Sequence, residues 1–388
     1  MLYVTWISLL LLLSNVLTAS VNAHSTHALL LLPTHSHAAV SGQRCPAPDP
    51  NLNFRPVIGI VSHPGDGCSG RLSNATNASY IAASYVKFVE SAGARVVPLI
   101  YNEPPEVLYK CLLVGFSSFS TMLNSTLSAS VSDKKLSLVN GVIFTGGSSK
   151  TGLYFEVVTS IFKDVLRKND AGDRFPLLAI CLGFELLTMI VSKDNNILER
   201  FSASDQASTL QFVENIDISG TVFQRFPPVL LNKLSTECIV MQNHKFGISP
   251  EKLQKTESLS SFFEILTTTA DSDDKVYVST AQAHRYPVTA LQWHPERVRH
   301  KIFDLKCKCF IFNIPMQKNA FEWASSSIPH SEDAIQVTQN VANFFIREAR
   351  LSTHRPPSQE VLDNLIYNYS PTYCGKAGKG FDEVYIFS

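Results

Sequence analysis

The chain has 388 residues, of which 45% are apolar and 17% are charged, a balance typical of globular proteins that bury a sizeable core. Lys and Arg together number 33, as do Asp and Glu, so the formal net charge is zero. Because no basic run could neutralise several phosphates, the sequence argues against nucleic acid as a partner.

The first 23 residues are predicted to form an export signal. An apolar run at 6–13 is followed by smaller residues that end in a cleavage signature at Ala23. A second apolar run at 28–33 is too short to span a bilayer, so we expect no stable membrane anchor. An anchor built from both runs is the alternative, although polar residues at 24–27 interrupt it.

Glycosylation signals agree with export. An N-x-S/T sequon marks an asparagine that can carry glycan on a surface loop, and two of them lie within four residues of each other. The sequons are at Asn74, Asn77, Asn124 and Asn368. We therefore expect a glycoprotein of the secretory pathway.

The eight cysteines are neither dense enough nor regularly enough spaced to predict a disulfide scaffold. This spacing leaves room for free thiols. Cys307 and Cys309 form a C-x-C pair, but no second pair follows at zinc-ligand spacing. No metal site is predicted there.

A short linker is predicted to precede the folded region. Residues 24–53 are rich in His, Ser, Ala and Pro without periodicity, which is typical of a linker or a trimmed segment. Folding is predicted to start near Phe54, and no repeat or internal linker follows. Residues 54–388 are therefore predicted to form one domain.

The first half of this domain alternates between short apolar strands and amphipathic helices. Strands are predicted at 56–63, 94–100, 138–149 and 175–180, and helices at 79–93, 152–169 and 183–192. Strands that are apolar on both faces and alternate with helices indicate a mostly parallel sheet covered on both sides.

The second half reads mainly as strands separated by polar turns. These strands are predicted at 209–218, 237–244, 263–271, 276–284 and 288–296. A final helix is predicted at 331–350, where apolar residues recur at helical spacing. The fold class is therefore α/β, with a mixed sheet in one domain.

Cys181 stands at the junction of the predicted strand 175–180 and the helix that follows it. Reactive groups in an open α/β sheet collect at the carboxyl ends of strands. The free N–H groups and the dipole of the following helix favour a thiolate there, as in the strand–turn–helix elbow of hydrolases. Gly183 is expected to let this tight turn close. A buried, inert cysteine is the alternative.

A thiol nucleophile needs a base, and the base needs a group that orients it. The segment "LQWHPE" offers both, because residues two apart on an extended chain point to the same side. Glu296 can therefore approach the ring of His294 and fix its tautomer. His294 also follows an apolar strand, which predicts that it lies at the same rim as Cys181. An ordinary loop histidine is the alternative.

The segment "FTGGSS" ends another predicted strand. Its glycines, Gly146 and Gly147, would let backbone N–H groups approach a developing oxyanion, and the N–H of Leu182 would complete the oxyanion hole. Glu185 follows the nucleophile by four residues and would face the same way. It is a candidate for binding a cationic group of the substrate.

The motifs "FTGG", "ICLGFELL", "MQNHKFG", "WHPE" and "KNAFEW", in this order, resemble those of the gamma-glutamyl hydrolases. This family belongs to the class I glutamine amidotransferase-like group of cysteine hydrolases. The resemblance runs from about residue 55 to residue 388 and is strongest to the plant members.

The resemblance implies a flavodoxin-like sheet sandwiched by helices. By matching position it makes Cys181 the nucleophile, His294 the acid and base, Glu296 the third member and His244 a substrate-site residue. It implies cleavage of gamma-glutamyl bonds in folylpoly-gamma-glutamates, small-molecule substrates, without cofactor or metal. It also implies residence in the vacuole or in the extracellular space and cell wall; a homodimer stays open.

One segment departs from the family pattern. Residues 297–317 separate "WHPE" from "KNAFEW", which in the family follow each other almost directly. A retained intron or an alternative splice product would explain this atypical insertion. Two other functions therefore stay open: a glutaminase of the amidotransferase type, and a binding glycoprotein whose catalysis the insertion impairs.

Overall fold

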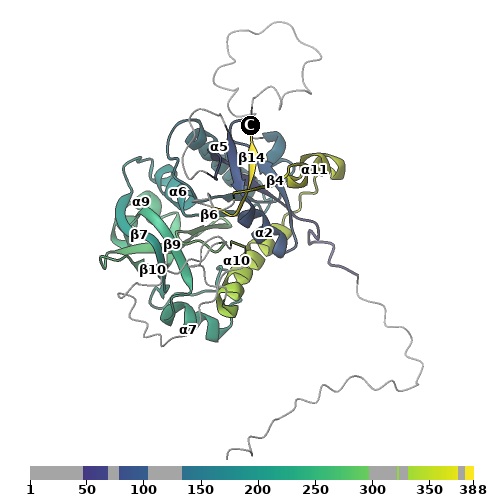
Figure 1. Cartoon of the computed structure of the whole chain (residues 1–388). Coiled ribbons are helices and arrows are strands. Elements are labelled where there is room, and N and C mark those ends of the chain that lie inside the picture. Colours follow the sequence, from purple (N-terminus) through teal and green to yellow (C-terminus); the bar gives the residue numbers. More distant parts are fainter. Residues whose placement is uncertain (1–46, 69–77, 104–132, 297–320, 323–330, 375–380) are drawn as a thin grey trace, which may run out of the picture. The chain divides into compact units, whose positions relative to one another are not determined.

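The computed structural model describes residues 47–68, 78–103, 133–296, 321–322, 331–374 and 381–388 (Figure 1). Several predictions lie outside the described residues: the export signal, most of the 24–53 linker, three of the sequons, and the 297–317 insertion with its C-x-C pair. The chain divides into the units Met1–Pro48 and Asp49–Ser388, and the fold below is that of the second unit.

An eight-stranded sheet forms the centre of this unit (Figure 1). Its strands, in spatial order, are β4 (Arg95–Leu99), β1 (Val57–Val61), β5 (Val142–Phe144), β6 (Leu177–Ile180), β12 (Val288–Leu291), β11 (Val276–Ala283), β10 (Phe263–Ala270) and β8 (Gln211–Phe212). The five strands from β4 to β12 are parallel, and β11, β10 and β8 continue antiparallel. The predicted mixed, mostly parallel sheet is confirmed.

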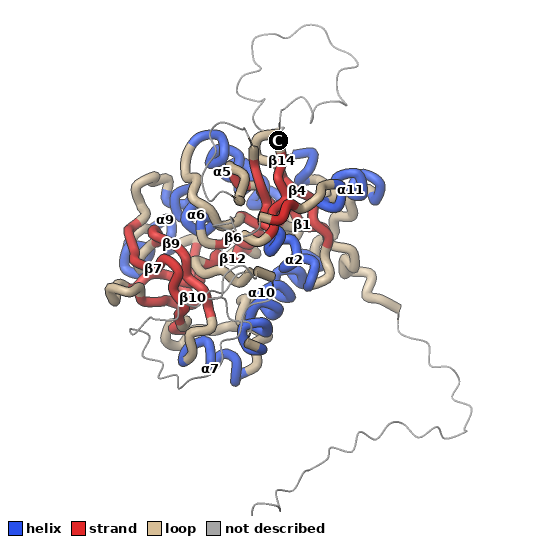
Figure 2. Tube along the Cα trace, in the orientation of Figure 1, coloured by secondary structure: helices blue, strands red, loops and turns tan. Residues whose placement is uncertain are grey.

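Helices cover both faces of the sheet (Figure 2). One face packs against α5 (Gly152–Asp170), α6 (Leu182–Ser192), α8 (Pro250–Lys255), α9 (Glu257–Ser260) and α11 (Ser358–Asn364). The other packs against α2 (Ala83–Ser91), α7 (Pro228–Thr236) and α10 (Glu332–Arg350). Because neighbouring residues of a strand point to opposite faces, β1 sends Val57 to the first cluster and Ile58 to the second.

The last long helix, α10, follows the prediction closely. Ser331 caps it, since the Ser331 side chain accepts a hydrogen bond from the N–H of Ala334 at 3.1 Å. Acidic residues occupy its first turn and basic residues its last, as the helix dipole favours. Among the described helices, none has the length and apolar character needed to cross a membrane.

The helix predicted at 79–93 is wrong at its start. Residues Ser79–Ala82 form β3, and the helix α2 begins only at Ala83. β3 lies in a small sheet between β2 (His63–Pro64) and β14 (Glu383–Phe387), which in turn pairs with β13 (Thr372–Tyr373). The partner that makes this segment extended thus comes from the far end of the chain.

A disulfide between Cys68 and Cys374 joins the same two ends of the chain across 306 residues. Cys238 is also disulfide-bonded. Among the described cysteines, only Cys181 carries a free thiol. The expectation that some thiols are free is therefore met at one described position.

A second antiparallel pair was predicted only in part. β7 (Glu199–Ser208) pairs with β9 (Val240–Gly247) with two register shifts, and together we call them the β7–β9 ribbon. The strand predicted at 209–218 is wrong beyond the two residues of β8. β7 alternates between exposed and buried residues over 200–204, but its sequence consists mainly of small and polar residues, which explains why the strand was missed.

Candidate active site

Two parallel neighbours bring the predicted thiol and imidazole to one edge of the sheet. Ile180 at the end of β6 is in register with Leu291 at the end of β12. The N–H of Cys181 then donates to the carbonyl of Leu291 at 2.7 Å, so the two chains leave the sheet side by side. His294 follows three residues later, at the carboxyl ends where open α/β sheets place their ligands.

Cys181 occupies a strained turn. Its φ is 52° and its ψ is −104°, a conformation that L-residues rarely adopt, and it directly precedes α6. The thiol is 4% exposed and lies 3.8 Å from the carbonyl oxygen of Asn243, to which it donates. This is the geometry of a nucleophile elbow, in which the turn holds the reactive atom at the sheet edge.

The role expected of Gly183 needs correction. The left-handed backbone belongs to Cys181 itself. A Cβ atom on Gly183 would lie 2.6 Å from the carbonyl oxygen of Phe144, so glycine is needed because α6 begins in close contact with the end of β5. Gly183 therefore allows α6 to pack closely against β5, and the backbone strain of the turn lies at Cys181.

His294 and Glu296 form a buried pair. Nδ1 of His294 lies 2.8 Å from Oε1 of Glu296, and because the carboxylate accepts, Nδ1 carries the proton. Glu296 is fully buried. Burial by itself would lower the pKa of His294, but the negative charges of Glu296 and Cys181 outweigh it and hold the pKa well above its ordinary value. These charges favour the imidazolium form of His294.

The imidazole and the thiol border the same glycine. A Cβ atom on Gly146 would lie 2.9 Å from Cε1 of His294 and 3.5 Å from Cβ of Cys181. A side chain there would separate the two groups or push one aside. The structure thus brings Cys181, His294 and Glu296 together as the spacing of the sequence predicted, with the glycine loop against them.

The glycine loop is held by two side chains that the sequence did not single out. The N–H of Gly146 donates to the hydroxyl of Tyr85 at 2.8 Å. Nε2 of His63 accepts from the N–H groups of Ser148 and Ser149 at 3.1 and 3.3 Å. The N–H of Gly147, between them, donates to no described residue, which fits the predicted oxyanion hole.

His63 must be neutral to hold the loop. Its Nδ1 lies 2.8 Å from the carbonyl oxygen of Pro64 and so carries the proton, which leaves Nε2 as the acceptor. Burial lowers the pKa of His63 to about 4, although the bond to Pro64 opposes this and the charge of Lys150 adds to it. The ring therefore stays an acceptor throughout the neutral range.

Replacing Gly147 with alanine should disable the site without unfolding the protein. The new Cβ would lie 2.3 Å from Cδ2 and Nε2 of His63, so the ring must move and the loop must shift. We expect a loss of about 100- to 1000-fold in kcat, the usual effect of losing one oxyanion donor. Steady-state kinetics would measure it.

Gly172→Ala is the matched control for this substitution. Gly172 also has a positive φ, of 85°, but nothing lies within 4 Å of its Cβ position. The Gly172→Ala substitution should lower the thermal midpoint slightly, because alanine is strained at a positive φ, and it should leave kcat unchanged. Equal losses of kcat in both variants would show that the Gly147 effect is one of stability alone.

Glu185 does not fit the interpretation that it binds a cation of the substrate. Its Oε2 is 2.6 Å from Nζ of Lys150, so a cation of the chain already occupies it. Burial raises the pKa of Glu185 to about 6, although Lys150 opposes the shift. Lys150 is partly exposed and has two further N–H donors, so the pair presents positive charge outward.

His244 lies beside this group on β9. Its Nδ1 is 2.8 Å from the carbonyl oxygen of Phe246, and its ring meets Tyr277 edge-on, with centroids 4.6 Å apart. Burial lowers the pKa of His244 to about 3, against the bond to Phe246. Nε2 is buried, and no described residue donates to it. It is therefore a free acceptor, as a substrate-site residue requires.

Three residues of the site were missed, for different reasons. His63 lies two residues beyond the end of β1, so its position at the rim of the central sheet was a usable signal. Lys150 follows the glycine loop by three residues and carried no pattern. Tyr85 lies on the buried face of α2, where an aromatic residue reads as ordinary core.

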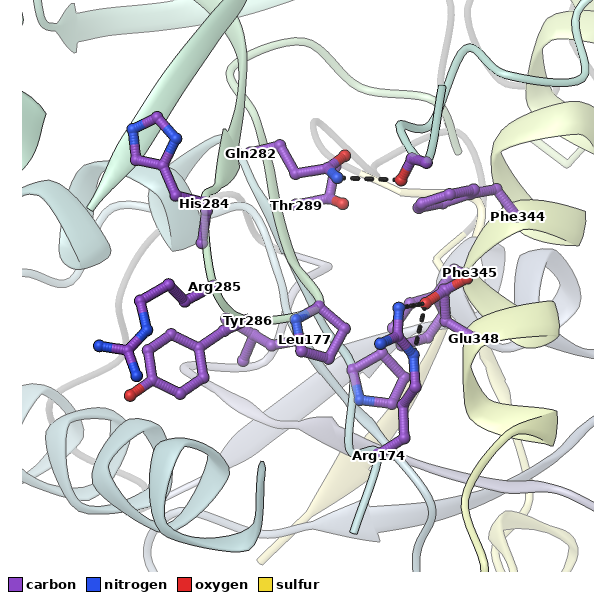
Figure 3. A pocket seen from close by; sticks show the side chains of 14 residues that line it. Arg174, Leu177, Gln282, His284, Arg285, Tyr286, Thr289, Phe344, Phe345 and Glu348 are labelled. Carbon is purple, nitrogen blue, oxygen red and sulfur yellow. Dashed lines mark hydrogen bonds and ion pairs between the residues drawn. The ribbon is translucent and has the colours of Figure 1, made fainter. Parts of the chain in front are cut away.

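A cavity of about 150 Å³ lies away from this site (Figure 3). It opens at the amino ends of β6 and β12, where Leu177 and Thr289 line it, and Cys181 follows the opposite end of β6. An ion pair between Arg174 and Glu348 closes one side. Its walls carry none of the predicted site residues, so it belongs to a different part of the molecule.

Metal ligands are not grouped in the part of the chain that the structure describes. No cluster of three or more His, Cys, Asp and Glu side chains there is arranged to hold a metal ion. What the described site offers is a thiol, an imidazole with a carboxylate, and backbone donors, which is the equipment of nucleophilic acyl transfer.

The fold and the sequence matches define the class. The family model "Glutamine amidotransferase class-I" matches residues 112–304. The chain is 58% identical to gamma-glutamyl hydrolase 2 of Arabidopsis thaliana over 93% of this chain and 91% of that protein, and 57% identical to gamma-glutamyl hydrolase 1 of the same plant over 92% and 90%. Gamma-glutamyl hydrolase of Glycine max is 50% identical over 95% and 94%. The chain belongs to the gamma-glutamyl hydrolase family.

Proposed function

We propose that this chain is a cysteine hydrolase that cleaves gamma-glutamyl bonds. The observation that carries the proposal is the free, buried thiol of Cys181 on a strained elbow, bordering the same glycine as the His294–Glu296 pair. The type of bond that is cleaved is inferred from the relatives, which are named gamma-glutamyl hydrolases.

In the first half of the reaction, the Cys181 thiolate attacks the side-chain carbonyl carbon of a glutamyl unit. The N–H groups of Gly147 and Leu182 stabilise the oxyanion, since the N–H of Leu182 opens α6 and has no acceptor within the helix. The C–N bond then breaks, and His294 gives its proton to the leaving amine. A thioester remains on Cys181.

In the second half, water adds to the thioester carbonyl carbon while His294 takes a proton from it. The C–S bond breaks, which releases the gamma-carboxylate and restores the thiolate. Glu296 keeps the imidazole in the required tautomer and stabilises its charged form throughout. No redox step or cofactor is required by this sequence of events.

The substrates that we propose are folylpoly-gamma-glutamates. Each gamma-linked unit keeps a free alpha-carboxylate, for which Lys150 has donors left, and an amide N–H, which the unpaired Nε2 of His244 can accept. These two contacts would orient the scissile unit over Cys181. Substrate binding thus falls to Lys150, in the loop between β5 and α5, and to His244 on β9.

Secretory localisation, in the vacuole or the extracellular space, is part of the proposal. The Cys68–Cys374 disulfide and the bonded Cys238 support it, because disulfides persist in oxidising compartments. A free thiol at Cys181 among bonded cysteines also fits a residue retained for chemistry.

One assay tests the proposed activity against its alternatives. Purified full-length chain is incubated with a pteroyl-pentaglutamate, and the chain length of the products and the ammonia released from glutamine are both measured. Shortening of the glutamate chain is the expected result. Ammonia release from glutamine without shortening would instead indicate a glutaminase, and binding without turnover would indicate an impaired binding protein.

A further inference from the structure

A hollow of about 430 Å³ lies along the β7–β9 ribbon, outside the residues assigned to the chemistry. Its walls come from β7, from β9 and from the turn between β10 and β11. The charged and aromatic residues that matter here are Arg200, Phe201, Lys245, Asp271 and Lys275. The ribbon is visible beside β10 in Figure 1.

Cations dominate the accessible side chains of this hollow. Arg200 and Lys245 are exposed and form no ion pair with a described carboxylate. Asp271 is buried, and its carboxylate accepts the N–H groups of Ser202 at 2.6 Å and of Lys275 at 2.9 Å. Backbone N–H groups therefore stabilise the carboxylate of Asp271. The one exposed acidic side chain in the lining is Asp273.

Aromatic rings hold two of the cations in place. Nζ of Lys275 lies 4.1 Å from the ring centroid of Phe201, and Cζ of Arg200 lies 5.7 Å from that of Phe246. Nζ of Lys275 also donates to the carbonyl oxygen of Arg200 at 2.9 Å and stands 3.7 Å from Glu199, which leaves its third N–H for an anion. Cations stacked on rings keep their N–H groups directed outward and available to an anion.

The hollow lies next to the site along β9. Lys245 follows His244 directly on this strand, so its side chain points to the exposed face of the ribbon, opposite to the buried ring of His244. The Phe246 ring links the two regions, because Nζ of Lys150 lies 4.7 Å from the same centroid that Arg200 approaches. A row of positive charge therefore leads from the scissile position onto the ribbon.

We propose that this cationic face of the β7–β9 ribbon binds the alpha-carboxylates of glutamyl units beyond the scissile bond. The inference rests on the proposed function, because a gamma-linked chain carries one such carboxylate on every unit. Arg200 pairs with a carboxylate through two parallel N–H donors, and Lys245 acts as a point charge. The protein would therefore bind longer glutamate chains more tightly, because each added unit brings a carboxylate to these cations.

For the unmodified enzyme, KM is expected to fall as the number of glutamyl units increases. In variants that lack Arg200 or Lys245, this decrease in KM should disappear. Arg200→Gln and Lys245→Gln should each raise KM for a pteroyl-pentaglutamate about two- to fivefold and leave kcat and the pteroyl-diglutamate KM unchanged. Raising the salt concentration should erase the same decrease in KM in the unmodified enzyme, because exposed charges are screened. Lys255→Gln, a 75% exposed lysine of α8 paired with Glu251, is the matched control.

Two outcomes separate this inference from the proposed function. Cleavage of both substrates with equal KM, or an equal response to Lys255→Gln, would overturn the inference and leave the hydrolase intact. If no substrate is cleaved, calorimetry of penta-gamma-glutamate with the unmodified chain and the Arg200→Gln, Lys245→Gln double variant decides. Binding that is salt-sensitive and lost in the double variant supports the site, and its absence refutes it.

Discussion

Cys181→Ala is expected to lower kcat/KM for a folyl polyglutamate by roughly 10⁴- to 10⁶-fold, because the thioester can no longer form. Alanine fits the space of the buried thiol, so the fold should persist. Packing around β6 and α6 stabilises the strained backbone at this position. The substitution leaves that packing unchanged. Product analysis by chromatography would measure the loss.

Two further measurements make this result specific to the nucleophile. The thermal midpoint of the alanine variant should match that of the unmodified chain. The alanine variant should also still bind substrate. Cys181→Ser places a hydroxyl where the thiol was and should recover little activity, because a serine hydroxyl is a much weaker nucleophile than a cysteine thiol near neutral pH. Turnover that survives in the alanine variant would remove Cys181 from the mechanism.

Glu296→Gln is expected to lower kcat by roughly 10³- to 10⁴-fold and to change the pH profile. The carboxylate charge of Glu296 helps to hold the pKa of His294 above its ordinary value. Without that charge the burial of the ring prevails, the pKa falls, and the imidazolium loses its proton at lower pH. The alkaline limb of kcat/KM against pH should therefore move toward acid.

Glu264→Gln is the control for this second substitution. Glu264 is an exposed carboxylate on β10, and its loss should change neither kcat nor the pH profile. A Glu296→Gln profile whose alkaline limb stays in place, with kcat reduced, would mean that Glu296 acts by packing rather than by charge. The combination of a lower kcat and a shifted limb is what the buried pair predicts.

The sequence by itself determined the elements whose signals are local. Apolar runs bounded by Gly and Pro predicted the parallel strands, and helical spacing predicted α10 to within a residue at its start. The Cys181 junction and the two-residue step from His294 to Glu296 were also local, because each follows from how a strand or an extended segment directs its side chains. Parallel neighbours then had to share one edge.

Only the tertiary structure decided the features that depend on partners far along the chain. β3 is a strand because β14 pairs with it from the other end of the chain, and no local pattern carries that information. Lys150 meets Glu185 only once β5 and β6 lie side by side, which turned an expected cation site into an internal ion pair. The same folding places His63 under the glycine loop and lines up the cations of the β7–β9 ribbon, since electrostatic and steric contacts across the sheet are set by packing and not by spacing.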